Sequence, residues 1–263
     1  MIPYMGSKAK LAPTILQYIL MHNENITDLY DLFGGGAAIS AESLKYKRIK
    51  THYNEIDPAI CELIKKINLD GVTEEFYQWV DRETFHKHKN GTDWFAGLVK
   101  TCWSFGNKGN DYLYGADIEA QKKEWHNQAM KDGYKLAQKN RLKSDDRTQH
   151  LERLQFLKPL QNLHITNLSY EKVPITGKNP VLYLDPPYQD TEIYQNDINH
   201  EELYRWVMSS PHKIYISSYK FFDLKPVLSI KHRSTLSSTN NAKTVTENLY
   251  CNKPENPITL TLW

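Results

Sequence analysis

The sequence predicts an α/β fold in which a doubly wound parallel sheet is interrupted by a mainly helical insertion. Residues 26–67 and 151–263 contain short apolar runs of strand length that alternate with helical spacing. Between them, residues 72–150 are rich in charged and aromatic side chains and have mainly helical patterning, interrupted at residues 104–115. We therefore expect a core domain formed by residues 1–71 and 151–263, and an inserted domain formed by residues 72–150.

The first half of the sheet is predicted by a strand, a glycine turn, a helix and a second strand. Residues 26–32 form a short apolar run, and the turn Phe33-Gly34-Gly35-Gly36 precedes a predicted helix over residues 37–44. Residues 49–55 are the second predicted strand, and Pro58 stands where a helix would begin. This order is typical of a sheet whose helices lie on both faces.

The α/β pattern returns after the insertion. Residues 151–163 have the spacing of one amphipathic helix, and residues 201–208 predict a second helix. Strands are predicted in the same part of the chain, at residues 163–168, 181–185, 213–217 and 257–263. Within the insertion, the glycine-rich run from Ser104 to Gly115 predicts a hairpin.

Composition narrows the class of protein. The chain has 263 residues, a formal net charge of +2 and 40% hydrophobic residues, which is ordinary for a soluble globular protein. Its three cysteines form no CxxC pair, so we expect neither a disulfide framework nor a structural zinc site. The N-terminus has no signal-peptide pattern, and no apolar run is long enough for a membrane span.

Asp185-Pro186-Pro187-Tyr188 directly follows a near-continuous apolar strand. In open α/β sheets ligands bind beyond the carboxyl ends of the strands, where this tetrapeptide would lie. The prolines lack N–H donors and the aspartate only accepts, so the segment offers acceptors and a flat aromatic face. Such a cage suits an amino group on a planar ring. The alternative interpretation is a strand end followed by a proline turn.

This tetrapeptide resembles the DPPY motif of the N6-adenine and N4-cytosine amino-methyltransferases. A glycine turn, then an insertion, then DPPY is similar to the order in Dam-like, α-class D12 DNA adenine methyltransferases. The resemblance implies a Rossmann-like core that binds S-adenosylmethionine, a target-recognition insertion, and methyl transfer to N6 of an adenine flipped out of DNA without a metal. It makes Asp185, Pro186, Pro187 and Tyr188 catalytic. An N4-cytosine methyltransferase and an inactive DNA-binding module are the alternatives.

Two further segments would hold the cofactor. The glycine turn lacks the third glycine of a dinucleotide fingerprint, and by the resemblance it contacts the methionine moiety through Asp31, Phe33, Gly34, Gly35 and Gly36. Glu55 lies about twenty residues past this turn, where a carboxylate typically binds ribose hydroxyls, with Ile56 beside it. Asp57 is the runner-up for the ribose, or an acid that opens the next helix. Topology places Asn167 and Leu168 near the cofactor adenine.

The N-terminal segment resembles an additional cofactor motif of the same family. It does not have the spacing of a phosphate-binding loop. The resemblance implies that the segment contacts the cofactor, with Lys8 near the carboxylate and Ser7 in place of the usual second glycine; its residues are Tyr4, Met5, Gly6, Ser7 and Lys8.

DNA contacts are expected from two stretches. The predicted hairpin of the insertion offers Asn107, Lys108 and Asn110 as base-reading side chains. Residues 211–246 have an excess of basic over acidic residues and could contact phosphates through Lys231, Arg233 and Lys243. Charged residues of this kind are also common on solvated surfaces.

The resemblance implies double-stranded DNA as the partner and leaves open a cognate restriction endonuclease of a restriction-modification system. We expect a monomer that acts in the cytoplasm of a bacterium or a phage-infected cell, without contact to a membrane. The DNA recognition sequence does not follow from the resemblance, because residues 104–115 depart from the family's arginine-containing hairpin.

Overall fold

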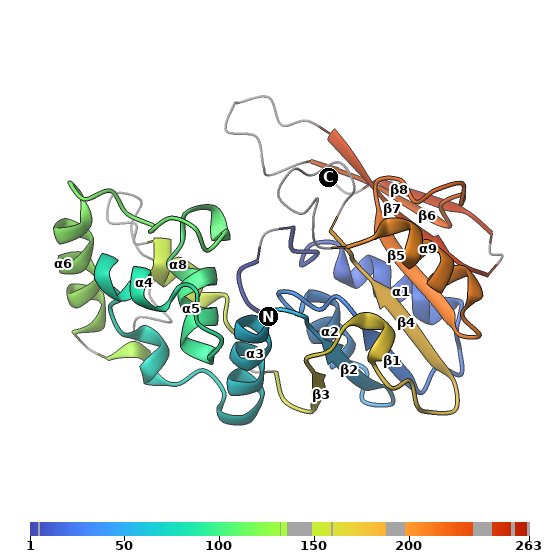
Figure 1. Ribbon diagram of the computed structural model, residues 1–263, viewed down its shortest axis with the longest axis horizontal. Coiled ribbons are helices and arrows are strands. Elements are labelled where there is room, and N and C mark those ends of the chain that lie inside the picture. The colour runs from blue at the N-terminus through green and yellow to red at the C-terminus, as the bar shows by residue number, and fades with distance from the viewer. Residues whose placement is uncertain are drawn as a thin grey trace.

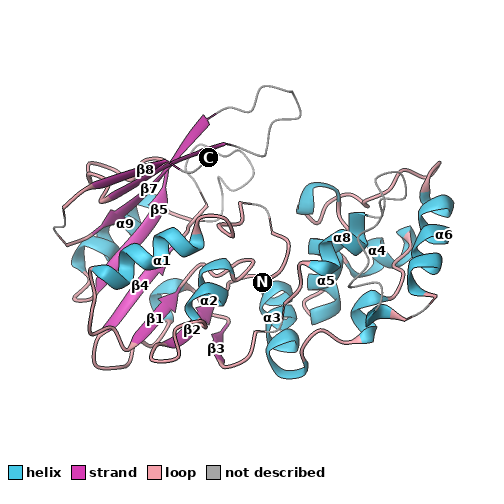
Figure 2. Ribbon diagram, turned by 180° about the vertical axis from the view of Figure 1, so that it is seen from behind, coloured by secondary structure: helices cyan, strands magenta, loops and turns pink. Residues whose placement is uncertain are grey.

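The computed structural model describes residues 1–4, 6–131, 133–135, 149–158, 160–187, 198–233, 244–253 and 256–261. These residues form two lobes that lie side by side (Figure 1). One lobe is built around a sheet, and the other is helical. Helix α3 (Pro58–Asp70) lies between them, as the reverse view in Figure 2 also shows.

The sheet has eight strands within the described residues, in the order β3-β2-β1-β4-β5-β7-β6-β8. Strands β1 to β5 are parallel, β7 is antiparallel to both β5 and β6, and β8 is parallel to β6. The order reverses between β1 and β4, which creates a ligand-binding crevice beyond their carboxyl ends. The predicted α/β fold with a doubly wound sheet is confirmed. The strands are β1 (Asp28–Asp31), β2 (Lys50–Asn54), β3 (Leu163–Thr166), β4 (Pro180–Leu184), β5 (Lys213–Ser218), β6 (Leu228–Arg233), β7 (Thr244–Cys251) and β8 (Ile258–Thr261).

Helices cover both faces of the sheet because alternate strand residues point to opposite sides. In β4, Val181 and Tyr183 pack with helices α1 (Ala12–Met21) and α2 (Ala38–Ser43), while Leu182 and Leu184 pack with α9 (His200–Ser209). Helix α9 faces the viewer in Figure 1, and α1 faces the viewer in Figure 2. Burial on both faces explains why β4 is a nearly continuous apolar run.

The helical lobe packs directly on α3. Gly97 of α5 lies so close to α3 that a Cβ atom there would be 2.2 Å from the Ala59 carbonyl oxygen. The buried core of the lobe is continuous with Ile60, Leu63 and Ile64 of α3, so the domain boundaries near residues 71 and 150 stay a prediction. The lobe contains short 3-10 turns at Glu74–Tyr77 and Phe105–Asn107, and the helices α4 (Arg82–His88), α5 (Trp94–Cys102), α6 (Glu119–Met130) and α8 (Gln149–Gln155).

One local prediction is wrong, and two features of the structure were not predicted. The single helix expected over residues 151–163 is wrong, because α8 ends at Gln155 and Asn162 adopts a φ of 71° before β3 begins. Pro159 explains the early end, since a proline lacks the amide that a helix needs and disfavours helical geometry in the residue before it. Helix α1 and the β6–β7 pair, which occupies part of the basic stretch 211–246, were not predicted.

Two further findings, on membrane-spanning helices and on cysteines, hold for the described residues. None of their helices is long and apolar enough to cross a membrane. The three cysteines, Cys61, Cys102 and Cys251, are buried, and no disulfide bond joins any two of them.

Candidate active site

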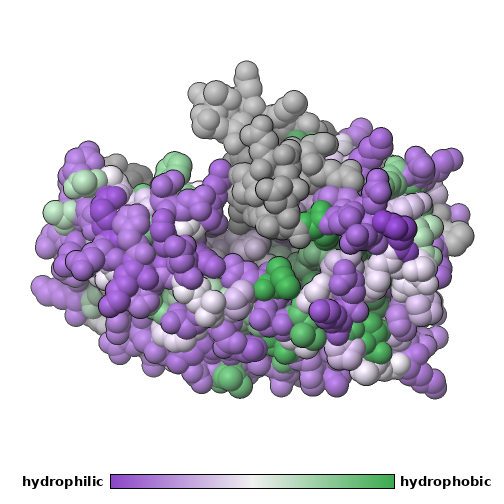
Figure 3. All heavy atoms as spheres, in the orientation of Figure 1, coloured by the Kyte–Doolittle hydropathy of each residue, from purple (hydrophilic) through white to green (hydrophobic). Residues whose placement is uncertain are grey.

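A cavity of about 770 Å³ lies beyond the carboxyl ends of β1, β2 and β4, at the point where the strand order reverses. Residues of both lobes line this cavity, and Figure 3 shows hydrophobic residues near the middle of the molecule among mostly hydrophilic ones. The N-terminal segment, the glycine turn, the ends of three strands and one residue of the helical lobe contribute to its wall. The lining residues used below are Tyr4, Gly6, Ser7, Lys8, Asp31, Phe33, Gly34, Gly35, Gly36, Glu55, Ile56, Asp57, Lys108, Leu168, Asp185, Pro186, Pro187 and Tyr219.

The glycine turn is packed too tightly for side chains. A Cβ on Gly34 would be 2.2 Å from the Tyr53 ring, and one on Gly36 would be 2.7 Å from Tyr4. Gly35 has a φ of 42°, a conformation that favours glycine. The Tyr53 hydroxyl donates to the Gly35 carbonyl at 2.8 Å. The turn therefore exposes backbone to the cavity while two tyrosines hold its shape.

Asp31 ends β1 and holds the start of α2. Its Oδ2 accepts hydrogen bonds from the Ser40 amide at 3.2 Å and the Ser40 hydroxyl at 2.7 Å. Burial raises the pKa of Asp31 to about 7, because the hydrogen bonds from Ser40 offset the desolvation only in part and Asp185 adds a second negative charge. Asp31 thus orients α2 behind the glycine turn.

Glu55 follows β2 and joins two loops of the cavity wall. Its two carboxylate oxygens accept from the amides of Gly35 and Asp57, each at 2.8 Å. The side chain is buried, which raises its pKa against the opposing effect of these hydrogen bonds. A carboxylate oxygen can accept more than one hydrogen bond, so the same fixed group can also accept from a ligand hydroxyl.

Asp57, the runner-up for the ribose, is engaged elsewhere. Its side chain accepts from the amides of Ala59 and Ile60 and so caps α3. It also forms an ion pair with Lys100 of α5 at 3.0 Å. We therefore assign Asp57 to helix capping and to the contact between the two lobes.

Asn167 and Leu168, expected near the cofactor adenine, differ in their surroundings. Leu168 lines the cavity beside Ile56, and these apolar side chains are 37% and 64% exposed. The amide of Asn167 instead donates to the carbonyl oxygens of Glu55 and Ile56, outside the cavity lining. Asn167 therefore fixes the loop after β2, whereas Leu168 and Ile56 form an apolar slot.

Asp185 stands at the end of β4, as predicted, and contacts the N-terminal segment. The Lys8 ammonium lies 2.9 Å from its carboxylate and 3.8 Å from that of Glu247 in β7. Burial by itself would lower the pKa of Lys8, but Asp185 and Glu247 outweigh it and leave the pKa raised. Lys8 thus contacts the segment that follows β4 directly, an arrangement that was not predicted from the sequence.

The model of the D12 class N6 adenine-specific DNA methyltransferases matches residues 4–218. The chain belongs to this family. The match includes the N-terminal segment, the glycine turn, Glu55 and Asp185, which the cavity brings together. The predicted adenine-specific DNA methyltransferase is confirmed, and the N4-cytosine alternative is set aside.

Other comparisons add little to this assignment. A solved structure named "Putative methyltransferase yhhF from Escherichia coli" is 13% identical, with 97% of this chain and 92% of that chain covered and a TM-score of 0.34. No curated protein sequence matches the chain.

The predicted DNA-contacting residues of this methyltransferase occupy different places. The hairpin is present, with a bridge between Ser104 and Tyr112, and its Lys108 lines the cavity. Asn107 adopts a φ of 58° at the tip, and the Asn110 carbonyl accepts from Lys89 at 2.7 Å. Lys231 is exposed on β6. Met5, Tyr188 and Lys243 lie outside the described residues, as does the side chain of Arg233.

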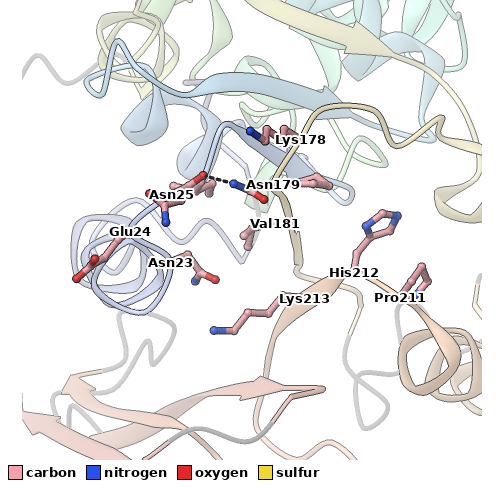
Figure 4. Close-up of a pocket in the computed structure, with 11 residues that line it drawn as sticks. Asn23, Glu24, Asn25, Lys178, Asn179, Val181, Pro211, His212 and Lys213 are labelled. Atoms are coloured by element: carbon pink, nitrogen blue, oxygen red, sulfur yellow. Dashed lines mark hydrogen bonds between the residues drawn. The ribbon is translucent and has the colours of Figure 1, made fainter.

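A second cavity, of about 460 Å³, lies at the amino ends of the parallel strands, opposite the first cavity (Figure 4). It is lined by the starts of β4 and β5 and by the loop after α1, where Asn179 donates to the Asn25 carbonyl. It contains none of the predicted site residues. Elsewhere in the described part of the chain, no group of three or more histidines, cysteines or acids could hold a metal ion.

Sequence reasoning missed Glu247 and Tyr219. Glu247 is separated from DPPY by about sixty residues and is buried in β7, while Tyr219 follows β5 and lines the cavity. A single acid in the pattern TVTENLYC gives little signal by itself. Its position depends on strand pairing, which the sequence analysis did not predict.

Proposed function

We propose that this methyltransferase transfers the methyl group of S-adenosylmethionine to N6 of an adenine flipped out of double-stranded DNA. The observation that carries the proposal is the single cavity that joins the glycine turn, Glu55 and the Asp185 segment. One half of this cavity has the features of a nucleoside pocket, and the other half has acceptors for an amino group.

The residues fit S-adenosylmethionine at the end of the cavity near β1 and β2. Glu55 presents a fixed carboxylate for the ribose hydroxyls, and the apolar Ile56 and Leu168 would flank the adenine ring. The backbone of the glycine turn would contact the methionine part, together with Phe33 and Tyr4. Gly6, Ser7 and Lys8 complete the wall beside Asp185.

At the other end, Asp185 and the Pro186 carbonyl would accept the two hydrogens of the target amino group. This amino nitrogen is a weak nucleophile because its lone pair is delocalised into the ring. Two acceptors favour a pyramidal nitrogen and stabilise the positive charge that develops on it. S-adenosylmethionine supplies an electrophilic methyl group on its sulfonium. As the new N–C bond formed, the S–C bond would break and leave S-adenosylhomocysteine, and the nitrogen would then lose one proton to water.

Base flipping is required because the N6 amino group is paired and stacked within duplex DNA. The target base would stack on Tyr188, next in the chain after Pro187. We propose that residues 72–150 recognise the DNA, since Lys108 of this stretch reaches the cavity wall. Lys231 on β6 is exposed and could contact the phosphate backbone.

Identification of the methylated nucleoside tests the proposed function. The protein is incubated with methyl-labelled S-adenosylmethionine and mixed-sequence duplex DNA, which is then digested to nucleosides. We expect the label in N6-methyldeoxyadenosine, and none in a matched duplex that contains only G·C pairs. Label in N4-methyldeoxycytidine, or transfer to RNA with none to DNA, would contradict the proposal. Sequencing of the methylated adenines would then give the recognition sequence.

A further inference from the structure

A buried ion cluster connects the N-terminal segment, β4 and β7 beside the cavity. The Lys8 ammonium lies 2.9 Å from Asp185 Oδ1 and 3.8 Å from Glu247 Oε1. The side chains of Lys8 and Glu247 are only 8% and 6% exposed, and that of Asp185 is 20% exposed. One cation therefore stands between two carboxylates, and the cluster has a net charge of −1 when all three are ionised.

Strand direction explains how Glu247 reaches this place. β7 runs antiparallel to β5, and their last pair is Ser218 with Asn248. Glu247 comes just before Asn248, so it lies beyond this pair, at the edge where the parallel strands end. Asp185 lies at the same edge after β4. Glu247 also falls outside residues 4–218, which the family model matches.

The charge that Asp185 presents to the cavity depends on how the charge of Lys8 is balanced. A one-to-one ion pair with Lys8 would neutralise Asp185, the carboxylate that is to accept from the target amino group. Positive charge passes from the sulfonium to the nitrogen during methyl transfer, so a neutral site would stabilise it less. The carboxylate of Glu247 balances the ammonium of Lys8, and Asp185 keeps its negative potential. In a buried site such a charge is only weakly screened.

We infer that Glu247 is a positioning residue that acts through Lys8 to keep the reacting end of the cavity negative. This inference rests on the proposed function. It predicts a preference for S-adenosylmethionine, which has a sulfonium charge, over the uncharged thioether of S-adenosylhomocysteine. Glu247 would thus favour both cofactor binding and product release.

The ratio of the two dissociation constants isolates this charge effect. Both ligands share the same adenosine, amino and carboxylate groups, so damage to the fold or a lost contact with those groups weakens both alike. For Glu247→Gln we expect the preference for S-adenosylmethionine to fall by about fivefold to fifteenfold, as one charge acting over roughly 10 Å at an effective dielectric constant of about 20 to 40 would produce. We also expect the single-turnover methylation rate to fall by about tenfold.

Further variants test the same charge effect, so that the conclusion does not depend on a single substitution. Lys8→Met leaves the two carboxylates and should raise the preference by about fivefold. Lys8→Met combined with Glu247→Gln restores a net charge of −1 and should return the ratio to within about twofold of the wild type. Asp223→Asn removes an exposed acid from the loop after β5 and should leave the ratio unchanged.

The outcomes distinguish this inference from the proposed function. If the ratio stays the same in Glu247→Gln and Lys8→Met while the wild type methylates adenine, the inference is wrong and the function stands. If the wild type binds neither ligand and transfers no methyl group, the proposed function itself fails. Titration calorimetry gives the dissociation constants, and a thermal melt of each variant shows that it is folded.

Discussion

The two lobes organise their polar residues in opposite ways. In the sheet lobe, Asp31, Glu55 and Asp185 come at strand ends and line an open cavity. In the helical lobe, three buried polar side chains, His126, His150 and Tyr114, are hydrogen-bonded to each other inside the core. His150 bonds to the Tyr114 hydroxyl at 2.7 Å and to His126 at 2.9 Å.

We infer from this difference that the polar groups of the sheet lobe serve the reaction, whereas those of the helical core stabilise the fold. Polar groups at the carboxyl edge of a sheet can be directed at a ligand because the strands hold them rigidly. A polar network that is enclosed among aromatic rings, such as Trp79 and Trp103, has no access to a ligand and instead specifies how helices pack. We therefore expect substitutions in the sheet lobe to affect the reaction, and substitutions in the helical core to affect folding.

The largest expected effect is on the reaction. Asp185→Ala removes the acceptor of the amino hydrogens and should lower the methylation rate by about a thousandfold. Folding should be retained, because the Asp185 side chain is partly exposed and its partner Lys8 keeps Glu247. Single-turnover kinetics measure the rate, with Asp223→Asn as the matched control. Unchanged turnover would refute the role of Asp185 and weaken the contrast between the lobes.

The next effect is on stability, at the contact between the lobes. Gly97→Ala would place a Cβ 2.2 Å from the Ala59 carbonyl oxygen and force α3 and α5 apart. We expect a loss of about 3 kcal/mol in the free energy of unfolding, measured by urea denaturation. Gln121→Ala, at an exposed position of α6, should change stability by less than about 0.5 kcal/mol. An equally small effect of Gly97→Ala would mean that the helices do not cross so closely.

Acid should weaken the helical lobe through its buried histidines. Burial lowers the pKa of His126 to about 4 and that of His150 well below its usual value, with His126 adding to the effect on His150. The unfolded chain, in which histidine has a pKa near 6.5, then binds more protons, so stability is present above pH 6.5 and falls as the pH drops toward 4.

For His126 alone the loss is about 2 kcal/mol at pH 5. Urea denaturation at pH 7.5 and pH 5, in the wild type and in His126→Gln, measures it. The variant should show a smaller drop between the two pH values. If both proteins lose the same stability, protonation of His126 is not the cause of the loss.

Glu55 should affect cofactor binding more than DNA binding. Glu55→Ala removes the carboxylate proposed to bind the ribose, and also the acceptor of the Gly35 and Asp57 amides. We expect the dissociation constant for S-adenosylmethionine to rise about tenfold, the usual effect of a lost hydrogen bond to a charged group. The affinity for DNA without cofactor should change by less than about twofold. An unaltered cofactor affinity would assign the ribose to another residue.

The smallest effect is expected from Lys108, which belongs to the helical lobe but lines the cavity. Lys108→Ala should weaken DNA binding about threefold and reduce the salt dependence of the binding constant by about one ion. Fluorescence anisotropy at several salt concentrations measures both, with the exposed Lys123→Ala of α6 as control. If the salt dependence is unchanged, Lys108 does not contact a phosphate.

Local patterns were sufficient for much of the fold. The glycine turn, the strand before Asp185 and the helix that starts at Pro58 have signals within a few residues, because turns, caps and buried strands depend on near neighbours. The β6–β7 pair was not predicted, since both strands mix polar and apolar residues and neither is a continuous apolar run. The early end of α8 was missed because helical spacing continued past Pro159.

The sequence by itself determined the fold class, the order of the cofactor and DPPY segments, and the family to which they belong. The tertiary structure decided which acids share the site. It placed Asp57 at a helix cap, Glu55 at the glycine turn, and Glu247 beside Lys8. The reason is physical: a motif depends on backbone geometry within a short segment, whereas the partner of a charge depends on which segments folding brings within a few ångströms.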